Sequence, residues 1–291
     1  MPNRLRCAML ALGLWTGLAT ATGLPENLRV PGGVAVLPLG AEENAPPLVS
    51  FGGKRALVMR DPAQSRWVAV VGIPLGTKPG EARIEVRNAA GKPAKPLGFK
   101  IEDKEYASQH LTIKNQRQVN PNPADLERIA REKQRVNAVK ATWSEGRVPD
   151  FPFSLPVDGR LSSPFGLRRF FNEQPRKPHS GLDIAAPEGT PIRAPADGVV
   201  ADRGEFFFNG NVVYLDHGQG VISSYSHMQQ IQVRPGQAVK RGEVIGKVGQ
   251  TGRVTGPHLH WDIMLNQTSV DPSLMIASPA PQTREPATDP M

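Results

Sequence analysis

Two short histidine motifs are the part of this 291-residue sequence best suited to chemistry. The first is HSGLD, with His179 and Asp183 four residues apart, and the second is HLH, with His258 and His260 two residues apart. In a β-strand, residues i, i+2 and i+4 share one face. Each motif can therefore project its polar pair to one side, and two adjacent strands can bring both pairs to a single point.

These residue types predict a metal site. Imidazole nitrogens and carboxylate oxygens are typical zinc ligands, and a catalytic zinc site uses three protein ligands and a water. Zinc lowers the pKa of that water to about 7, and a further histidine can move a proton or stabilise an oxyanion. Each motif alone is also typical of ordinary polar strand residues, and strand periodicity does not say which histidine of HLH binds the metal.

The segments around the two motifs resemble the LytM-type zinc peptidases, the lysostaphin-like family M23. The similar segments follow in order: GRLSSPFGLR (159–168), HSGLDI with GTPI (179–184 and 189–192), APADGVV (194–200), NVVYLDHG (211–218), SYSHM (224–228), VKRGEVIG (239–246) and TGRVTGPHLHW (251–261). Met228 and Asp262 depart from the family pattern, where leucine and glutamate are common. The resemblance covers nearly all of residues 151–276.

This resemblance implies a role for each site residue. His179, Asp183 and His260 would bind one Zn²⁺ per chain, and His227 and His258 would act as general base and oxyanion stabilisers. The implied activity is hydrolysis of peptide cross-links in bacterial peptidoglycan by zinc-activated water, with D-alanyl–diaminopimelate cross-links favoured over glycine bridges. The alternative is a non-enzymatic LytM-type activator of cell-wall amidases, but the presence of all these site residues favours the enzyme.

Two further residues are predicted to bind substrate. Tyr225 precedes His227 by two residues and so shares its expected strand face, with core packing as the alternative. Arg168 is expected either to bind a substrate carboxylate or to brace a loop. His217 lies in the turn signature DHGQG and is predicted to be structural, and the solitary His110 is predicted to have a surface or structural role. The three phenylalanines at 206–208 are expected at the rim of the cleft.

The elements that must position these residues are mainly β. Residues 22–110 contain alternating apolar strands between turn signals and are predicted to form a small β-domain. Residues 111–150 are a linker with one helix near 120–145, where apolar residues recur at helical spacing. Residues 151–276 are expected to form the LytM-type antiparallel β-sheet catalytic domain. The N-terminal domain and the helix could hold the enzyme latent by covering its groove, or the domain could bind wall glycan.

The two ends of the chain and its charge indicate where it works. Residues 1–21 combine Arg4 and Arg6 with an apolar run and a small-residue ending, which predicts a secretory signal. Cys7, the single cysteine, lies inside this signal, so the mature chain would have no thiol ligand. We expect secretion across the inner membrane to the periplasm or cell wall, with no membrane span after signal cleavage.

The formal charge of +8 suits anionic surroundings such as the cell wall, and no basic helix or aromatic-rich basic run points to nucleic acid. The expected partner is peptidoglycan, and the sequence does not determine the oligomeric state. Residues 277–291 are rich in Pro, Ser and Thr and are predicted to be a disordered tail.

Overall fold

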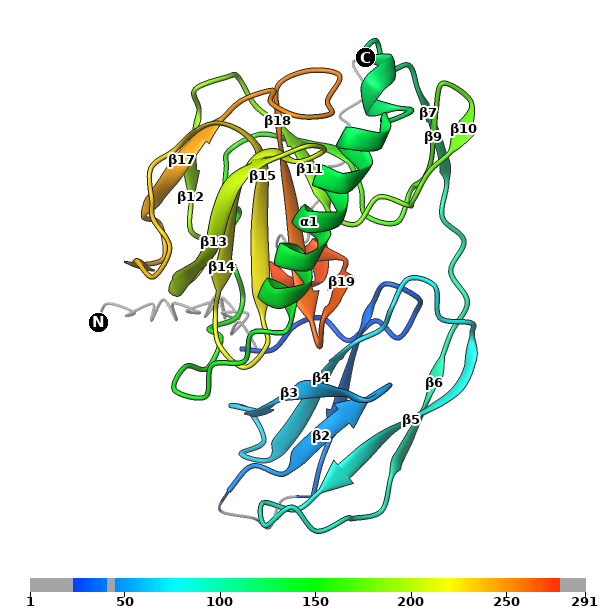
Figure 1. Ribbon diagram of the computed structural model, residues 1–291. Helices are drawn as coiled ribbons and strands as arrows, with labels where there is room; N and C mark the ends of the chain where they lie inside the picture. The colour runs from blue at the N-terminus through cyan, green and yellow to red at the C-terminus, as the bar shows by residue number, and fades with distance from the viewer. Residues whose placement is uncertain (1–22, 41–44, 278–291) are drawn as a thin grey trace, which may run out of the picture.

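The protein consists almost entirely of β-strands, with one α-helix among the residues that the computed structural model describes, 23–40 and 45–277 (Figure 1). A six-stranded sheet forms the N-terminal domain, and a ten-stranded antiparallel sheet forms the C-terminal domain. The predicted mainly β fold with a single linking helix is confirmed. The predicted signal, 1–21, lies outside the described residues, as does the predicted tail beyond Ala277.

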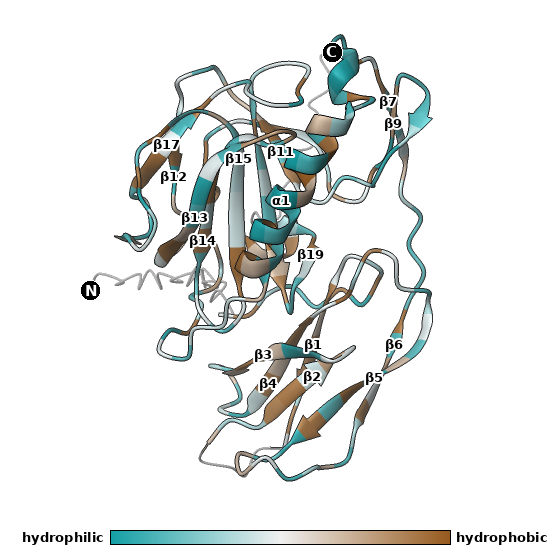
Figure 2. Cartoon of the chain, viewed as in Figure 1, coloured by the Kyte–Doolittle hydropathy of each residue, from teal (hydrophilic) through white to brown (hydrophobic). Residues whose placement is uncertain are grey.

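The N-terminal sheet has the strand order β1-β4-β3-β2-β5-β6. Its strands are β1 (Val34–Pro38), β2 (Leu48–Phe51), β3 (Lys54–Arg60), β4 (Trp67–Gly72), β5 (Gly80–Arg87) and β6 (Leu97–Ile101). In β4, Ala69 and Val71 pack into the core of this domain, whereas Val68 and Val70 join the main core of the C-terminal domain. Both faces of β4 are therefore buried, which explains its unbroken apolar sequence (Figure 2).

A tight hairpin joins the two domains. Asn266 and Gln267, between β18 (His258–Leu265) and β19 (Thr268–Val270), have φ values of 37° and 66°, as a two-residue type I′ turn requires. The Asn266 side chain accepts a hydrogen bond from Gly72 N at 2.6 Å and donates one to Gly72 O at 2.9 Å. A Cβ atom on Gly72 would lie 2.9 Å from Cβ of Leu265, so this position accepts only glycine without a shift.

The linker adds a strand to the C-terminal domain, which the sequence did not predict. Strand β7 (Ser108–Leu111) pairs in parallel with β9 (Arg168–Phe171), and β10 (Gln174–Pro175) completes a three-stranded sheet. A short 3₁₀ helix, η1 (Gln116–Gln118), follows β7. Ile113 and Val119 pack against Phe171 in a small separate core. The linker is thus part of the C-terminal domain's structure.

Helix α1 (Pro123–Lys140) begins at a complete capping box. Asn122 accepts a hydrogen bond from Asp125 N at 2.9 Å, and Asp125 accepts one from Asn122 N at 3.3 Å. Near the other end, Val136 and Val139 pack against a small cluster of the large sheet. Hydrophilic residues cover much of the rest of the helix (Figure 2). The helix therefore lies on the sheet as an amphipathic cover.

The C-terminal sheet follows the order β16-β13-β14-β15-β18-β11-β8, with β12, β17 and β19 attached to it. Its remaining strands are β8 (Arg160–Ser163), β11 (Leu182–Ala185), β12 (Pro191–Arg193), β13 (Gly198–Phe206), β14 (Gly210–Asp216), β15 (Ile222–Ile231), β16 (Ala238–Val239) and β17 (Val244–Val248), followed by the 3₁₀ helix η2 (Pro272–Met275).

The two faces of this sheet have different roles. Tyr225 of β15 lies opposite Trp261 of β18, and both enter the main core. The next pair along, Ser226 and His260, faces the other side. Met264 also lies on that side, four residues beyond His260, and packs in the cluster beneath α1. The helix therefore lies on the sheet face that carries His260, and Figure 1 shows α1 lying across this sheet.

Candidate metal centre

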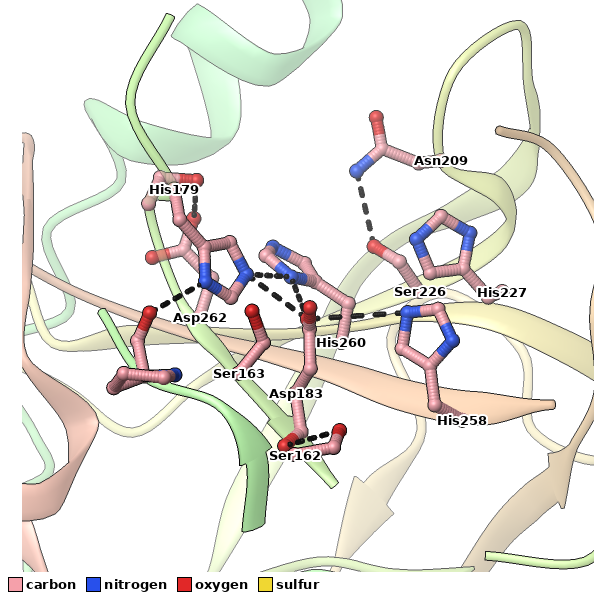
Figure 3. Close-up of polar contacts among 12 residues, drawn as sticks. Ser162, Ser163, His179, Asp183, Asn209, Ser226, His227, His258, His260 and Asp262 are labelled. Carbon is pink, nitrogen blue, oxygen red and sulfur yellow. Dashed lines mark hydrogen bonds and ion pairs between the residues drawn. The ribbon is translucent and has the colours of Figure 1, made fainter. Parts of the chain in front are cut away.

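Strand pairing brings the two sequence motifs together. Asp183 of β11 lies directly opposite His260 of β18, and His179 comes from the loop that precedes β11. His179 Nε2 lies 2.9 Å from Asp183 Oδ1 and 3.0 Å from His260 Nδ1, and His260 Nδ1 lies 2.8 Å from Asp183 Oδ1 (Figure 3). All three side chains are buried. The predicted convergence on one point is what the structure shows.

The glycine between the two residues of the first motif is required by this packing. A Cβ atom on Gly181 would lie 2.4 Å from Trp261 O and 2.9 Å from the ring of His260. Contacts that short do not occur without a shift of the backbone or of His260 itself. Gly181 thus allows the loop of His179 to approach β18 closely enough for the triad to form.

The chemistry of the three atoms fits a zinc ion. His179 Nδ1 lies 2.7 Å from Pro164 O, so Nδ1 carries the hydrogen and Nε2 presents a lone pair. Burial lowers the pKa of His179 to about 4, which keeps the imidazole neutral at neutral pH. Ligands of tetrahedral zinc at about 2.0–2.1 Å lie roughly 3.4 Å apart, close to the separations found here. Two imidazoles and one carboxylate form a donor set that zinc uses.

Asp183 is held at both oxygens. Oδ1 faces the two histidines, while Oδ2 accepts a hydrogen bond from Arg169 Nη2 at 2.8 Å. Burial raises the pKa of Asp183, but His179 and His260 outweigh it and hold the pKa well below its ordinary value. The carboxylate is therefore ionised at neutral pH, with one oxygen directed at the metal position.

Arg169, and not the predicted Arg168, is the arginine at this site. Arg169 lines the cavity and its side chain is 17% exposed, whereas Arg168 is exposed and lies outside the cavity lining. Burial lowers the pKa of Arg169, and Asp183 opposes that effect. Arg168, predicted either to bind a substrate carboxylate or to brace a loop, therefore lies outside this cavity. Phe171 shares the strand face of Arg169 and is buried, but Arg168 shares its face with Phe170 in the same way, so the sequence carried no signal that separates the two arginines.

Two further histidines lie beside the triad. The rings of His227 and His258 are 4.9 Å apart between centroids, and the ring of His227 is 6.0 Å from that of His260. His227 Nδ1 lies 2.8 Å from Thr251 O, and His258 Nδ1 lies 2.8 Å from Gly256 O. Each Nδ1 therefore carries a hydrogen, and each Nε2 is left as a proton acceptor. His258 Nε2 lies 3.9 Å from Asp183 Oδ1.

The prediction that Tyr225 binds substrate is wrong in this structure. Its side chain has no exposed surface, lies in the main core and shares a hydrogen bond of 2.7 Å with Ser223 Oγ. The cause is a β-bulge. Asn211 pairs with Met228 and Val213 with Tyr225, so β15 holds one extra residue there, and His227 takes a φ of 65°. The bulge breaks the alternation that would have placed Tyr225 and His227 on one face.

A cavity of about 310 Å³ surrounds the histidines. Leu111 and Ile113 of the linker and Phe208 of the β13–β14 loop contribute to its walls, together with the triad, His227 and His258. The residues that line it include none from 23–105 of the N-terminal domain. In the loop, Phe207 N donates a hydrogen bond to Glu132 of α1 at 2.9 Å, so the helix fixes the rim without lining the cavity.

The remaining histidines of the described residues, His110 and His217, lie outside the cavity lining. His217 has no exposed surface, and its Nδ1 lies 2.8 Å from Asp197 O while Nε2 lies 2.7 Å from Ser223 Oγ. His110 is exposed, stacks on Phe170 and pairs with Glu173. Within the described ranges, no helix combines the length and the apolar composition that crossing a membrane requires.

Two family models match the chain. Residues 177–272 match the model of peptidase family M23, and residues 27–104 match that of the peptidase family M23 N-terminal domain. A crystal structure described as a peptidase M23 from Pseudomonas aeruginosa is 47% identical, with a TM-score of 0.73. That similarity covers 86% of this chain and 96% of the other. It therefore includes both domains and the linker.

Curated relatives are similar over the C-terminal part. The DD-carboxypeptidase/endopeptidase Mpg of Neisseria meningitidis serogroup B is 45% identical over 123 residues, which is 42% of this chain and 28% of that protein. The peptidoglycan DD-endopeptidase ShyC of Vibrio cholerae is 46% identical over 119 residues, 40% of this chain and 28% of that protein. The match thus spans less than a third of the length of each relative.

Proposed function

Since this chain belongs to peptidase family M23, we propose that it is a zinc metallo-endopeptidase that hydrolyses peptide cross-links of bacterial peptidoglycan. The observation that carries the proposal is the convergence of three lone-pair donors, His179 Nε2, Asp183 Oδ1 and His260 Nδ1, within 3.0 Å of one another. The names of the relatives, a DD-carboxypeptidase/endopeptidase and a peptidoglycan DD-endopeptidase, support the substrate class.

The triad would hold one Zn²⁺, with Asp183 fixed from behind by Arg169. Bound there, zinc supplies Lewis-acid polarisation of a substrate carbonyl and activation of a water molecule. The protein's part is to keep the three ligands deprotonated and correctly oriented before substrate arrives. Burial of His179 and the hydrogen bond from its Nδ1 to Pro164 O serve this purpose.

His258 and His227 would handle the proton. Both present an unprotonated Nε2, so each can accept a proton and can donate a hydrogen bond to an oxyanion only after doing so. We assign the general base to His258, because its Nε2 lies 3.9 Å from Asp183 Oδ1 and therefore beside the metal position. Burial, with His258 and His260, lowers the pKa of His227 well below its ordinary value, so His227 starts neutral. After it accepts a proton, it would donate a hydrogen bond to the oxyanion or pass the proton to the leaving amine.

The bond we assign is the D-alanyl–diaminopimelate amide, which joins two D-centres and so agrees with the DD activity in the relatives' names. Such a substrate lies outside the inner membrane. We therefore propose that the chain is exported by its residues 1–21 and acts in the periplasm or cell wall. Mass determination of the protein recovered from that compartment, with cleavage after Ala21 as the expected result, tests the export.

Digestion of purified peptidoglycan tests the activity. The zinc-loaded wild type should convert cross-linked muropeptide dimers to monomers of the masses that D-alanyl–diaminopimelate cleavage gives. His260→Ala should lose both bound zinc and cleavage, while His110→Ala, which removes an exposed histidine outside the cavity, should retain both. Undiminished cleavage by His260→Ala would exclude the proposed centre.

The alternative, a non-enzymatic activator of amidases, predicts a different outcome. Such a protein would contain no zinc, leave peptidoglycan intact by itself and increase the activity of an added wall amidase. The complete and converging set of ligands and flanking histidines favours the peptidase. Zinc content of the purified protein separates the two functions.

A further inference from the structure

Arg253 is a partly buried cation in the wall of the proposed active site. It lies in the loop between β17 and β18 and lines the same cavity as the triad. Its guanidinium carbon lies 4.6 Å from the ring centroid of Phe171 and 4.2 Å from that of Phe208. These cation–π contacts fix the position of the charge inside the cavity.

This charge has no acidic partner in the described part of the chain. The hydrogen bond found for its side chain is a long one, from Nη1 to Gln118 O at 3.4 Å. The neighbouring arginines differ: Arg169 is paired with Asp183, and Arg176 donates to Val119 O and to Gln174 Oε1. Burial lowers the pKa of Arg253, and the nearby charges of Arg169 and Arg176 lower it further, to about 10. Arg253 therefore remains charged at neutral pH.

A partly buried charge without an ionic partner is costly, and the cost is recovered when an anion binds beside it. We propose that Arg253 is a substrate-binding residue that receives a free carboxylate next to the scissile amide. The guanidinium offers planar N–H donors that match a carboxylate, and Nε and Nη2 have no acceptor within the described ranges. This inference rests on the proposed function and names the group by which the site selects its substrate.

The chemistry of the cross-link identifies which carboxylate this is. In a D-alanyl–diaminopimelate amide, the carbon that bears the scissile nitrogen also bears a free carboxylate. That group is two bonds from the nitrogen that leaves, so it must enter the small cavity together with the scissile bond. A glycine bridge has no charged group at this position. Arg253 would thus favour an amide whose leaving residue ends in a carboxylate.

The test compares two substrates and three variants. The substrates are a cross-linked D-alanyl–diaminopimelate peptide and the same peptide with the carboxylate beside the scissile nitrogen converted to a carboxamide. The variants are Arg253→Met, Arg253→Lys and Lys177→Met, and thermal melting confirms that each is folded. Lys177 is the matched control because it is an exposed cation that lines the same cavity.

The wild type should prefer the carboxylate substrate by about 10- to 100-fold in kcat/KM, the range for a charge-assisted hydrogen bond. Arg253→Met should lose this preference, Arg253→Lys should keep part of it, and Lys177→Met should keep all of it. If Arg253→Met slows both substrates equally, Arg253 only supports the cavity wall and the inference is wrong. A wild type without any preference also overturns it.

Equilibrium binding separates this inference from the proposed function. The probes are N-acetyl-D-alanyl-D-alanine and its carboxamide, titrated against the zinc-free protein so that no hydrolysis occurs. Weaker binding of the carboxamide that disappears in Arg253→Met supports the carboxylate site, even if no cross-link is cleaved and the proposed function fails. Equal binding of both probes to wild type overturns the carboxylate site, even if peptidoglycan is cleaved.

Discussion

Replacing Arg169 by methionine tests how the metal centre is held. Arg169 Nη2 donates to Asp183 Oδ2 at 2.8 Å, with the two side chains 17% and 9% exposed. Without this bond, the carboxylate is free to rotate, and Oδ1 no longer faces His179 and His260 in one fixed orientation. The other interactions of Arg169, with Gln109 Oε1 at 3.2 Å and Ser163 Oγ at 3.4 Å, are weaker.

The size of the effect follows from the charged hydrogen bond. Such a bond contributes about 1.5–3 kcal/mol, and loss of a residue that orients a metal ligand typically costs about 10–100-fold in metal affinity. We therefore expect Arg169→Met to bind zinc about 10–100-fold more weakly than wild type. Methionine keeps much of the buried apolar volume, so the loss of packing is small.

Competition with a chromophoric chelator at neutral pH measures the zinc affinity directly. Arg168→Met is the matched control, because it removes an exposed arginine from the adjacent position of β9. Melting of the zinc-free proteins shows whether the substitution acts through folding. If Arg169→Met and Arg168→Met bind zinc equally tightly, Arg169 does not position Asp183 and this reading of the site fails.

Three other substitutions have defined outcomes. His258→Ala should retain zinc but lose about 10²–10⁴-fold in kcat, as expected for a general base; loss of zinc together with activity would instead make His258 a ligand. Burial lowers the pKa of His217 to about 4, against about 6.5 in the unfolded chain. The unfolded chain therefore binds the proton first, and acid favours unfolding. Stability should be lost as the pH falls from about 6.5 towards 4, by about 2 kcal/mol at pH 5. His217→Gln should flatten this part of the pH dependence of unfolding by urea, and an unchanged slope would contradict the assignment. Tyr225→Phe should lower stability by about 1 kcal/mol through its lost hydrogen bond with Ser223 and leave kcat/KM unchanged; a large fall in kcat/KM would restore Tyr225 to the site.

The residues that converge at the candidate metal centre could be predicted because their spacing is local. The two histidines of HLH lie on one strand, and HSGLD places Asp183 on a strand and His179 in the loop before it. This placement follows from local spacing and needs no knowledge of the rest of the fold. The choice of His260 over His258 came from the family resemblance, and the structure supports it with distances from Asp183 Oδ1 of 2.8 Å and 3.9 Å.

The orientations of Arg169 and Tyr225 could not be predicted, because they depend on strand pairing and on a β-bulge. Strand β9 reads Arg168-Arg169-Phe170-Phe171, in which either alternate set gives one arginine and one phenylalanine, so periodicity cannot say which arginine faces the cavity. The parallel pairing with β7, more than fifty residues earlier, settles the question. Tyr225 was misplaced because the bulge at His227 needs a positive φ in a residue other than glycine, which composition does not reveal.

The linker contributes directly to the cavity that contains the histidines. Leu111 and Ile113 line the cavity, and Ile113 is also buried against Phe171, so this segment forms a permanent wall. The side chain of Gln109 of β7 accepts a hydrogen bond from Arg169, which in turn holds Asp183. A lid that keeps an enzyme latent must leave without damage to the site beneath it, whereas removal of this segment would expose Phe171 and free Arg169. The N-terminal domain contributes no residue to the cavity lining, and β7, the first strand of the chain that leaves it, supports Arg169 through Gln109.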